Sequence, residues 1–275
     1  MGSASTRSIK YHGQFEIQTS YCSSEPPAIV AMEVTSSGGL LVCDKANMKV
    51  KLFDDYFRPV TEVSLPAEPY GMVLVEHNKM LVSLPDSHCL QSLTLSNDQR
   101  LTLKEKIQTE LKCDRMINYG DSLIVSSHDQ KAISLNIINL NGQVIRCIRK
   151  EDITPGGMFN NLGFIALSPD NSVIYVTEMC NGCIGVSVST GEILFVYKES
   201  RTKFLFGVCT DSEGYVYISS TDREKMVMLD SQGNKVKQLA TLSDSSPGFM
   251  TYSTLQKKLF IKTVYTNKIL VYKLA

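Results

Sequence analysis

A five-residue apolar pattern recurs six times along the chain and limits the fold more than any other feature. The copies are Leu40–Asp44 (LLVCD), Met80–Leu84 (MLVSL), Leu123–Ser127 (LIVSS), Ile174–Glu178 (IYVTE), Val216–Ser220 (VYISS) and Leu259–Thr263 (LFIKT). Their third residues, Val42, Val82, Val125, Val176, Ile218 and Ile261, are 40, 43, 51, 42 and 43 positions apart. Strands this short cannot bury themselves, so the copies must pack on one another. A period of about 40 to 45 residues with several strands per copy indicates the blades of a β-propeller.

The segments around each copy predict four short strands per blade. Blades are expected at about 29–65, 69–107, 113–149, 162–197, 204–241 and 248–274. The last blade lacks a fourth strand, and the strand predicted at 9–19 is the one left to cover its open edge. The sequence therefore predicts an all-β, six-bladed propeller of four-stranded blades. It forms a single domain over 9–275, closed by the N-terminal strand, with residues 1–8 expected to be a tag or disordered.

The composition predicts an ordinary folded chain with no global charge. Lys plus Arg and Asp plus Glu number 28 each, so no overall field draws the chain to nucleic acid or membrane. No apolar run approaches the roughly 18 residues of a membrane span, and the N-terminus lacks a signal-peptide pattern. Eight cysteines, often within apolar strands, and the lack of any Asn-x-Ser/Thr sequon favour a cytoplasmic location.

Two copies resemble the NHL repeat. In the stretch 207–236, Gly207, Asp211, Gly214, Tyr217 and Ile218 occupy the places of that motif, and in 163–188 Gly163, Asp170, Tyr175 and Val176 do so. The other four copies are degenerate. Six such blades resemble the last domain of tripartite-motif (TRIM-NHL) ubiquitin ligases, whose RING finger, B-boxes and coiled coil precede the propeller. The resemblance implies a recognition module for a ubiquitination substrate, in a parent that is oligomeric through its coiled coil.

The predicted binding face lies in the loops at one end of the central channel, because the strands are used up in packing. These loops combine cations with aromatic residues: Lys45, Tyr70, Lys112, Arg115, Lys131, Phe159, Arg201, Lys203, Phe204, Phe206, Arg223, Phe249, Tyr265 and Lys268. They also carry carboxylates such as Asp86, Asp114 and Asp129. A mixed surface of this kind is typical of protein contacts, and we predict a protein partner. Single-stranded RNA is the alternative, because cations neutralise phosphates and aromatic rings stack on unpaired bases.

The sequence predicts no catalysis, cofactor or metal for this chain. A metal-dependent lactonase or esterase stays open as a second alternative, because other six-bladed propellers hold a divalent metal in the channel. The nearest ligand candidates here are Asp44, Asn118, Asn161 and Glu178. Cys180 and Cys183 form a C-x-x-C pair, which is at most half of a tetrahedral zinc site, and we expect a plain turn there.

Overall fold

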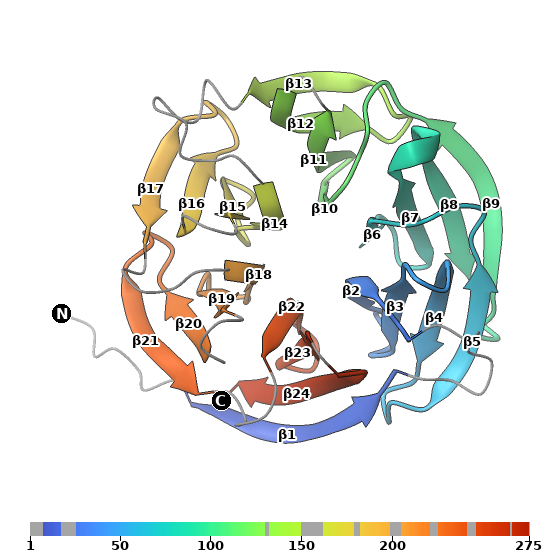
Figure 1. Cartoon of the computed structure of the whole chain (residues 1–275), viewed down its shortest axis with the longest axis horizontal. Coiled ribbons are helices and arrows are strands. Elements are labelled where there is room, and N and C mark those ends of the chain that lie inside the picture. Colours follow the sequence, from blue (N-terminus) through green and yellow to red (C-terminus); the bar gives the residue numbers. More distant parts are fainter. Residues whose placement is uncertain are drawn as a thin grey trace.

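The strands form a ring of six blades around a central channel (Figure 1). The computed structural model describes residues 8–17, 26–129, 132–149, 162–178, 182–198, 205–220, 225–240, 246–264 and 266–274. Each blade is a four-stranded antiparallel sheet, so the predicted fold class is confirmed. No helix among the described residues has the length and apolar character that a membrane span requires.

The blades follow one another in chain order, and each begins at the channel and ends at the rim. Blade 1 consists of β2 (Ile29–Val34), β3 (Leu40–Asp44), β4 (Lys49–Phe53) and β5 (Pro59–Ser64). Blade 2 consists of β6 (Gly71–Leu74), β7 (Lys79–Leu84), β8 (Cys89–Leu95) and β9 (Leu101–Gln108). Blade 3 consists of β10 (Met116–Tyr119), β11 (Ser122–Asp129), β12 (Ala132–Asn139) and β13 (Val144–Arg149). Blade 4 consists of β14 (Leu162–Leu167), β15 (Val173–Glu178), β16 (Gly182–Ser187) and β17 (Ile193–Tyr197). Blade 5 consists of β18 (Leu205–Thr210), β19 (Val216–Ser220), β20 (Lys225–Leu229) and β21 (Lys235–Ala240). Blade 6 contains β22 (Pro247–Ser253), β23 (Lys258–Thr263) and β24 (Lys268–Leu274).

The N-terminal strand closes the ring, as predicted. β1 (Ile9–Glu16) pairs antiparallel with β24 and is the outermost strand of blade 6 (Figure 1). Immediately after β1, the Ile17 backbone N–H donates to the Asn267 carbonyl at 2.8 Å, and the Ile17 side chain is fully buried. It packs in a cluster with Met32, Phe53 and Phe260, between the last blade and the first. Closure therefore depends on side-chain packing as well as on strand pairing.

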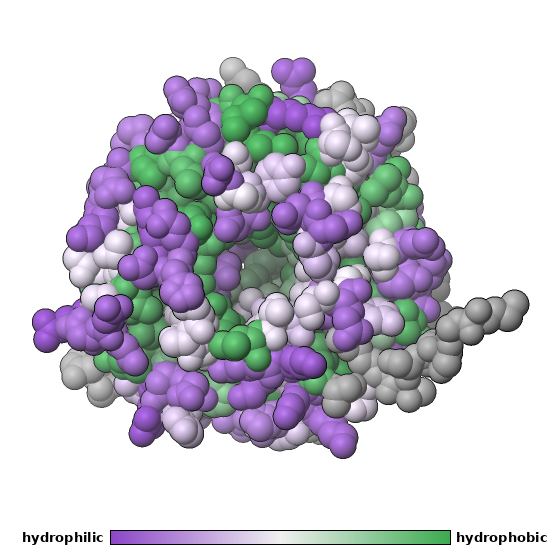
Figure 2. Space-filling view, turned by 180° about the vertical axis from the view of Figure 1, so that it is seen from behind, coloured by the Kyte–Doolittle hydropathy of each residue, from purple (hydrophilic) through white to green (hydrophobic). Residues whose placement is uncertain are grey.

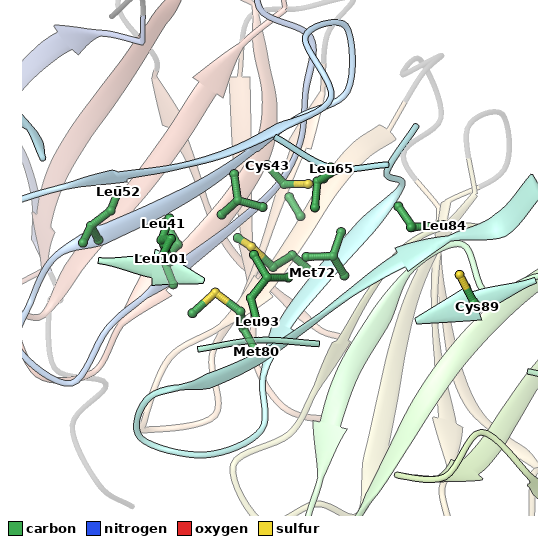
Figure 3. Close-up of a cluster of buried hydrophobic side chains, with 13 residues drawn as sticks. Leu41, Cys43, Leu52, Leu65, Met72, Met80, Leu84, Cys89, Leu93 and Leu101 are labelled. Atoms are coloured by element: carbon green, nitrogen blue, oxygen red, sulfur yellow. The ribbon is translucent and has the colours of Figure 1, made fainter. Parts of the chain in front are cut away.

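The repeated apolar pattern forms the second strand of every blade and is buried throughout. Its side chains point alternately to the two faces of a blade, so each blade packs against both neighbours. Figure 3 shows one such interface, where Leu41 and Leu52 of blade 1 meet Met72, Met80 and Leu93 of blade 2. The cores lie between blades, which is why a single copy of the repeat would not be stable alone.

Hydroxyl groups at the fourth position of the pattern link successive blades. Ser83 Oγ donates to the Asp114 carbonyl at 2.9 Å, Thr177 Oγ1 to the Phe206 carbonyl at 3.0 Å, and Ser219 Oγ to the Gly248 carbonyl at 2.6 Å. Each acceptor belongs to the next blade along the chain. The small polar residues of the pattern thus satisfy backbone groups where the innermost strands begin.

The motif residues of blade 5 build a turn. Asp211 is buried; its Oδ1 accepts the N–H groups of Glu213 and Tyr215, at 2.8 and 3.2 Å, and its Oδ2 accepts the Tyr217 hydroxyl at 2.8 Å. Gly214 has φ of +87°, a conformation that favours glycine. The Asp, Gly and Tyr of this copy are therefore explained by the connection between β18 and β19.

Candidate functional site

The innermost strands of all six blades line the central channel. A cavity of about 180 Å³ lies within it, bordered by Glu33 of β2, Ile117 of β10 and Thr251 of β22 among others. Figure 2 shows the hollow at the centre of one face, in a surface where polar and apolar residues are mixed. The channel can admit water or a small group, but not a folded element.

A larger cavity of about 390 Å³ lies against four consecutive blades; we call it the mouth pocket. Its lining residues are Tyr70, Pro85, Asp86, Lys112, Asp114, Arg115, His128, Leu162, Gly163, Phe164 and Phe206. Pro85 and Asp86 belong to a short 3₁₀ helix, η1 (Pro85–Ser87), between β7 and β8. Arg115 and Phe164 border both cavities, so the mouth pocket lies directly beside the channel.

The charged groups around the mouth pocket are mostly paired. Lys112 Nζ lies 3.0 Å from Asp86 Oδ1, and His128 Nδ1 lies 2.6 Å from Asp114 Oδ2. Beside the pocket, Lys45 Nζ donates to the Tyr70 hydroxyl at 2.5 Å and lies 3.3 Å from Glu68. Among the described residues, the surface therefore alternates in sign over short distances and does not form a basic stripe.

Arg115 spans the mouth of the channel. Its Nη1 donates to the Val30 carbonyl of blade 1 at 2.5 Å and to the Tyr70 carbonyl ahead of blade 2 at 2.6 Å. Its guanidinium carbon lies 4.0 Å from the ring centre of Phe164 in blade 4. Burial lowers the pKa of Arg115 to about 10, while the carboxylate of Asp114 raises it, so the side chain remains a cation at neutral pH.

Three phenylalanines form an aromatic wall beside Arg115. The ring centre of Phe164 lies 5.2 Å from that of Phe206 and 5.0 Å from that of Phe249. These residues begin the innermost strands of blades 4, 5 and 6. Phe164 is buried, whereas Phe206 and Phe249 are only partly buried, so these two provide the apolar area that a partner can contact.

The innermost strand β2 has the sequence IVAMEV, and Glu33 is its one acidic residue. Strand register places Glu33 at the level of Val73, Ile117, Ala166, Cys209 and Thr251 in the other blades, since each of these pairs with the second residue of the repeated pattern. Burial in the channel wall raises the pKa of Glu33 to about 8. A carboxyl group therefore occupies a position that is apolar or small elsewhere in the ring.

Four of the fourteen predicted site residues meet in the mouth pocket: Tyr70, Lys112, Arg115 and Phe206. Lys45 contacts Tyr70, and Phe249 borders the channel. Lys268, at the start of β24, borders neither cavity. Seven others lie outside the described residues: Lys131, Phe159, Arg201, Lys203, Phe204, Arg223 and Tyr265.

Asp44, the first of the metal-ligand candidates, is not part of an open surface. Its side chain is fully buried, and Oδ2 accepts from Lys51 Nζ and Asn47 Nδ2, both at 2.8 Å. Oδ1 accepts the Ala28 N–H at 3.1 Å. The carboxylate holds the turn between β3 and β4 and neutralises a buried lysine.

Two of the other metal-ligand candidates lie on different blades, on β10 and at the end of β15. Asn118 lies on β10 and is exposed, Glu178 is buried at the end of β15, and Asn161 lies outside the described residues. Within the described part of the chain, no three His, Cys, Asp or Glu side chains gather as a metal site requires. Cys183 is a buried free thiol, whereas Cys180 is outside the described residues.

Sequence reasoning missed Phe164 and the channel carboxyl of Glu33. Phe164 follows Gly163 at the start of an innermost strand, as Phe249 follows Gly248, and that shared Gly-Phe pair was the available signal. For Glu33 the signal was a single acid within an apolar innermost strand.

Comparisons with known proteins agree with the fold. No protein-family model matches the sequence, and no curated protein sequence matches it. Among solved structures, the β-propeller domain of Cps50 (Swd1) from Myceliophteria thermophila is similar with a TM-score of 0.64 and 15% identity, over 90% of this chain and 83% of that chain. XC5397, a gluconolactonase from Xanthomonas campestris, is similar with a TM-score of 0.66 and 14% identity, over 87% and 83%. At these identities the likeness shows the fold alone.

Proposed function

We propose that this chain is a non-catalytic recognition module that binds a protein partner at the mouth pocket. One observation carries the proposal: side chains from four consecutive blades converge on a single cavity of about 390 Å³. The cavity combines aromatic rings, an arginine and carboxylates, which is the mixture that protein interfaces use at their centres. His128, Phe164 and Phe206 lie on strands, and hydrogen bonds to His128 and to the Tyr70 carbonyl hold Asp114 and Arg115 beside them, so the site is preorganised.

The pairing of the charges favours protein over RNA. Lys112 and Lys45 each lie beside a carboxylate, Asp86 and Glu68 respectively, and a phosphate backbone would meet those carboxylates as well. Single-stranded RNA requires a groove of uncompensated cations along several nucleotides.

The same proposal includes an NHL-type origin and a cytoplasmic location. The residues that resemble the NHL motif, Asp211, Gly214 and Tyr217, build the turn of blade 5. The buried thiols of Cys43, Cys113 and Cys209 suit a reducing compartment. In a TRIM-NHL parent, this chain would select the ubiquitination substrate.

The test is capture of partners from a lysate after chemical crosslinking, with protein and RNA identified separately. We expect Lys112→Ala and Phe206→Ala to lose a protein partner that the wild-type chain captures. Arg58→Ala serves as the control, because Arg58 is an exposed side chain paired with Asp54 away from the pocket. Loss of RNA in place of protein, with steep dependence on salt, would favour the RNA alternative. Hydrolysis of a lactone by the purified chain would favour the enzyme.

A further inference from the structure

Only one nitrogen of the Arg115 guanidinium, Nη1, donates hydrogen bonds to the described residues. A guanidinium carries five N–H donors, and the two on Nη1 are directed to the Val30 and Tyr70 carbonyls. Among the described residues, the three donors on Nε and Nη2 have no acceptor. The neighbouring carboxylate of Asp114 is hydrogen-bonded to the ring and the backbone N–H of His128. Arg115 thus presents an unused donor edge at the boundary of the two cavities.

The position of this edge is fixed before any ligand arrives. The two carbonyl acceptors belong to blades 1 and 2, and the Phe164 ring packs on the guanidinium from blade 4. An arginine held in this way loses little conformational freedom when it binds a second group. Neither Nε nor Nη2 of Arg115 is a fully buried atom without a partner, so water can reach both donors, and a bound carboxylate would replace that water with charge-assisted hydrogen bonds.

The charges around Arg115 restrict the ligand to one with little negative charge. Asp86 and Asp114 both border the mouth pocket. These carboxyl groups would oppose a phosphate dianion more strongly than a carboxylate. The Nε and Nη2 edge matches the two oxygens of one planar carboxylate.

We propose that Arg115 binds a single carboxylate of the partner, from an acidic side chain or a chain terminus, at the boundary of the mouth pocket and the channel. The proposal rests on the proposed function and names the chemistry of its ligand. The aromatic wall of Phe164, Phe206 and Phe249 then receives the apolar part of the same segment.

The experiment is an NMR titration of the whole chain that follows the Arg115 Nε–Hε signal. The probes are N-acetyl-aspartate N-methylamide for a side-chain carboxylate, N-acetyl-alanine for a terminal carboxylate, N-acetyl-asparagine N-methylamide as the neutral match, and methyl phosphate. We expect at least one carboxylate probe to shift the signal with saturation. The neutral amide should leave it unchanged, and methyl phosphate should bind more weakly. Which carboxylate binds more tightly distinguishes the two sources.

Arg115→Lys keeps the positive charge but loses the paired N–H donors of Nε and Nη2. It should therefore weaken carboxylate binding by about tenfold or more, as measured by ligand-observed titration. Arg58→Lys is the matched control and should bind as wild type. Equal binding of the aspartate and asparagine probes to the wild-type chain would overturn the proposal, whatever the stability of the variant. So would tighter binding of methyl phosphate, or unchanged binding by a folded Arg115→Lys chain.

Failure of this inference is distinguishable from failure of the proposed function. If partner capture is lost with Phe206→Ala and retained with Arg115→Lys, the mouth pocket is the binding site and the carboxylate contact is wrong. If neither variant affects capture, the proposed function is wrong, and the titration still decides whether Arg115 binds carboxylates.

Discussion

Replacement of Ile17 by alanine tests how the ring is closed. Ile17 is fully buried and packs with Met32, Phe53 and Phe260 across the junction of the last and first blades. Truncation removes three buried carbons and leaves a cavity between the two blades. Because the strands of each blade are fixed by their own pairing, the cavity cannot fully close, and we expect the unfolding free energy to fall by about 2–5 kcal/mol. For a single domain of this size, about 3 kcal/mol lowers the melting temperature by roughly 6–12 °C.

Chemical and thermal denaturation measure this effect, and Ile145→Ala is the matched control. Ile145 lies on β13, the outermost strand of blade 3, and is 60% exposed, so its truncation should change stability by less than about 0.5 kcal/mol. Equal melting temperatures for the two variants would refute closure by the N-terminal segment.

Three further predictions concern buried polar groups. Glu33→Gln should stabilise the chain at pH 8 relative to wild type and have little effect near pH 5. The folded state holds the Glu33 proton up to a pKa of about 8 against an ordinary 4.5, so wild-type stability falls as pH rises through that window. A loss of about 1–3 kcal/mol is expected, and parallel stability curves for the two proteins from pH 5 to 8 would contradict it. Asp44→Asn leaves the buried Lys51 without its carboxylate and should cost about 3–5 kcal/mol in urea denaturation; a cost below 1 kcal/mol would show that the pair is not buried. Ser219→Ala breaks the link to Gly248 in blade 6 and should cost about 1–3 kcal/mol, whereas Ser96→Ala in an exposed turn should not.

The architecture was predictable because the apolar pattern reports packing between neighbours. All six copies became buried second strands, and the need to cover an open sheet edge correctly assigned β1 to the last blade. Strand ends were less exact. Blade 3 was predicted to begin at Cys113, but β10 begins at Met116, because the backbones of Asp114 and Arg115 both bond to Ser126 of β11 and so interrupt the regular register.

The site was predictable only to the level of loops. The pattern placed Tyr70, Lys112, Arg115 and Phe206 at one end of the channel, and the structure brings them to one cavity. It did not show that the Arg115 guanidinium crosses to Val30, 85 positions away in the sequence. Nor did it separate a buried acid such as Asp44 from an exposed one such as Asp86, since both follow or flank a second strand. Those distinctions depend on which side chain faces which neighbour across blades.

Site-specific photocrosslinking tests recognition at the mouth pocket most directly. A photoreactive amino acid would replace Phe206 in one chain and Ile145 in another, and crosslinked species would be identified after illumination in a lysate. Recognition at the mouth pocket predicts peptides of a protein partner attached at position 206 and few at position 145. Attachment of RNA at position 206, or of protein only at the outer position 145, would contradict it.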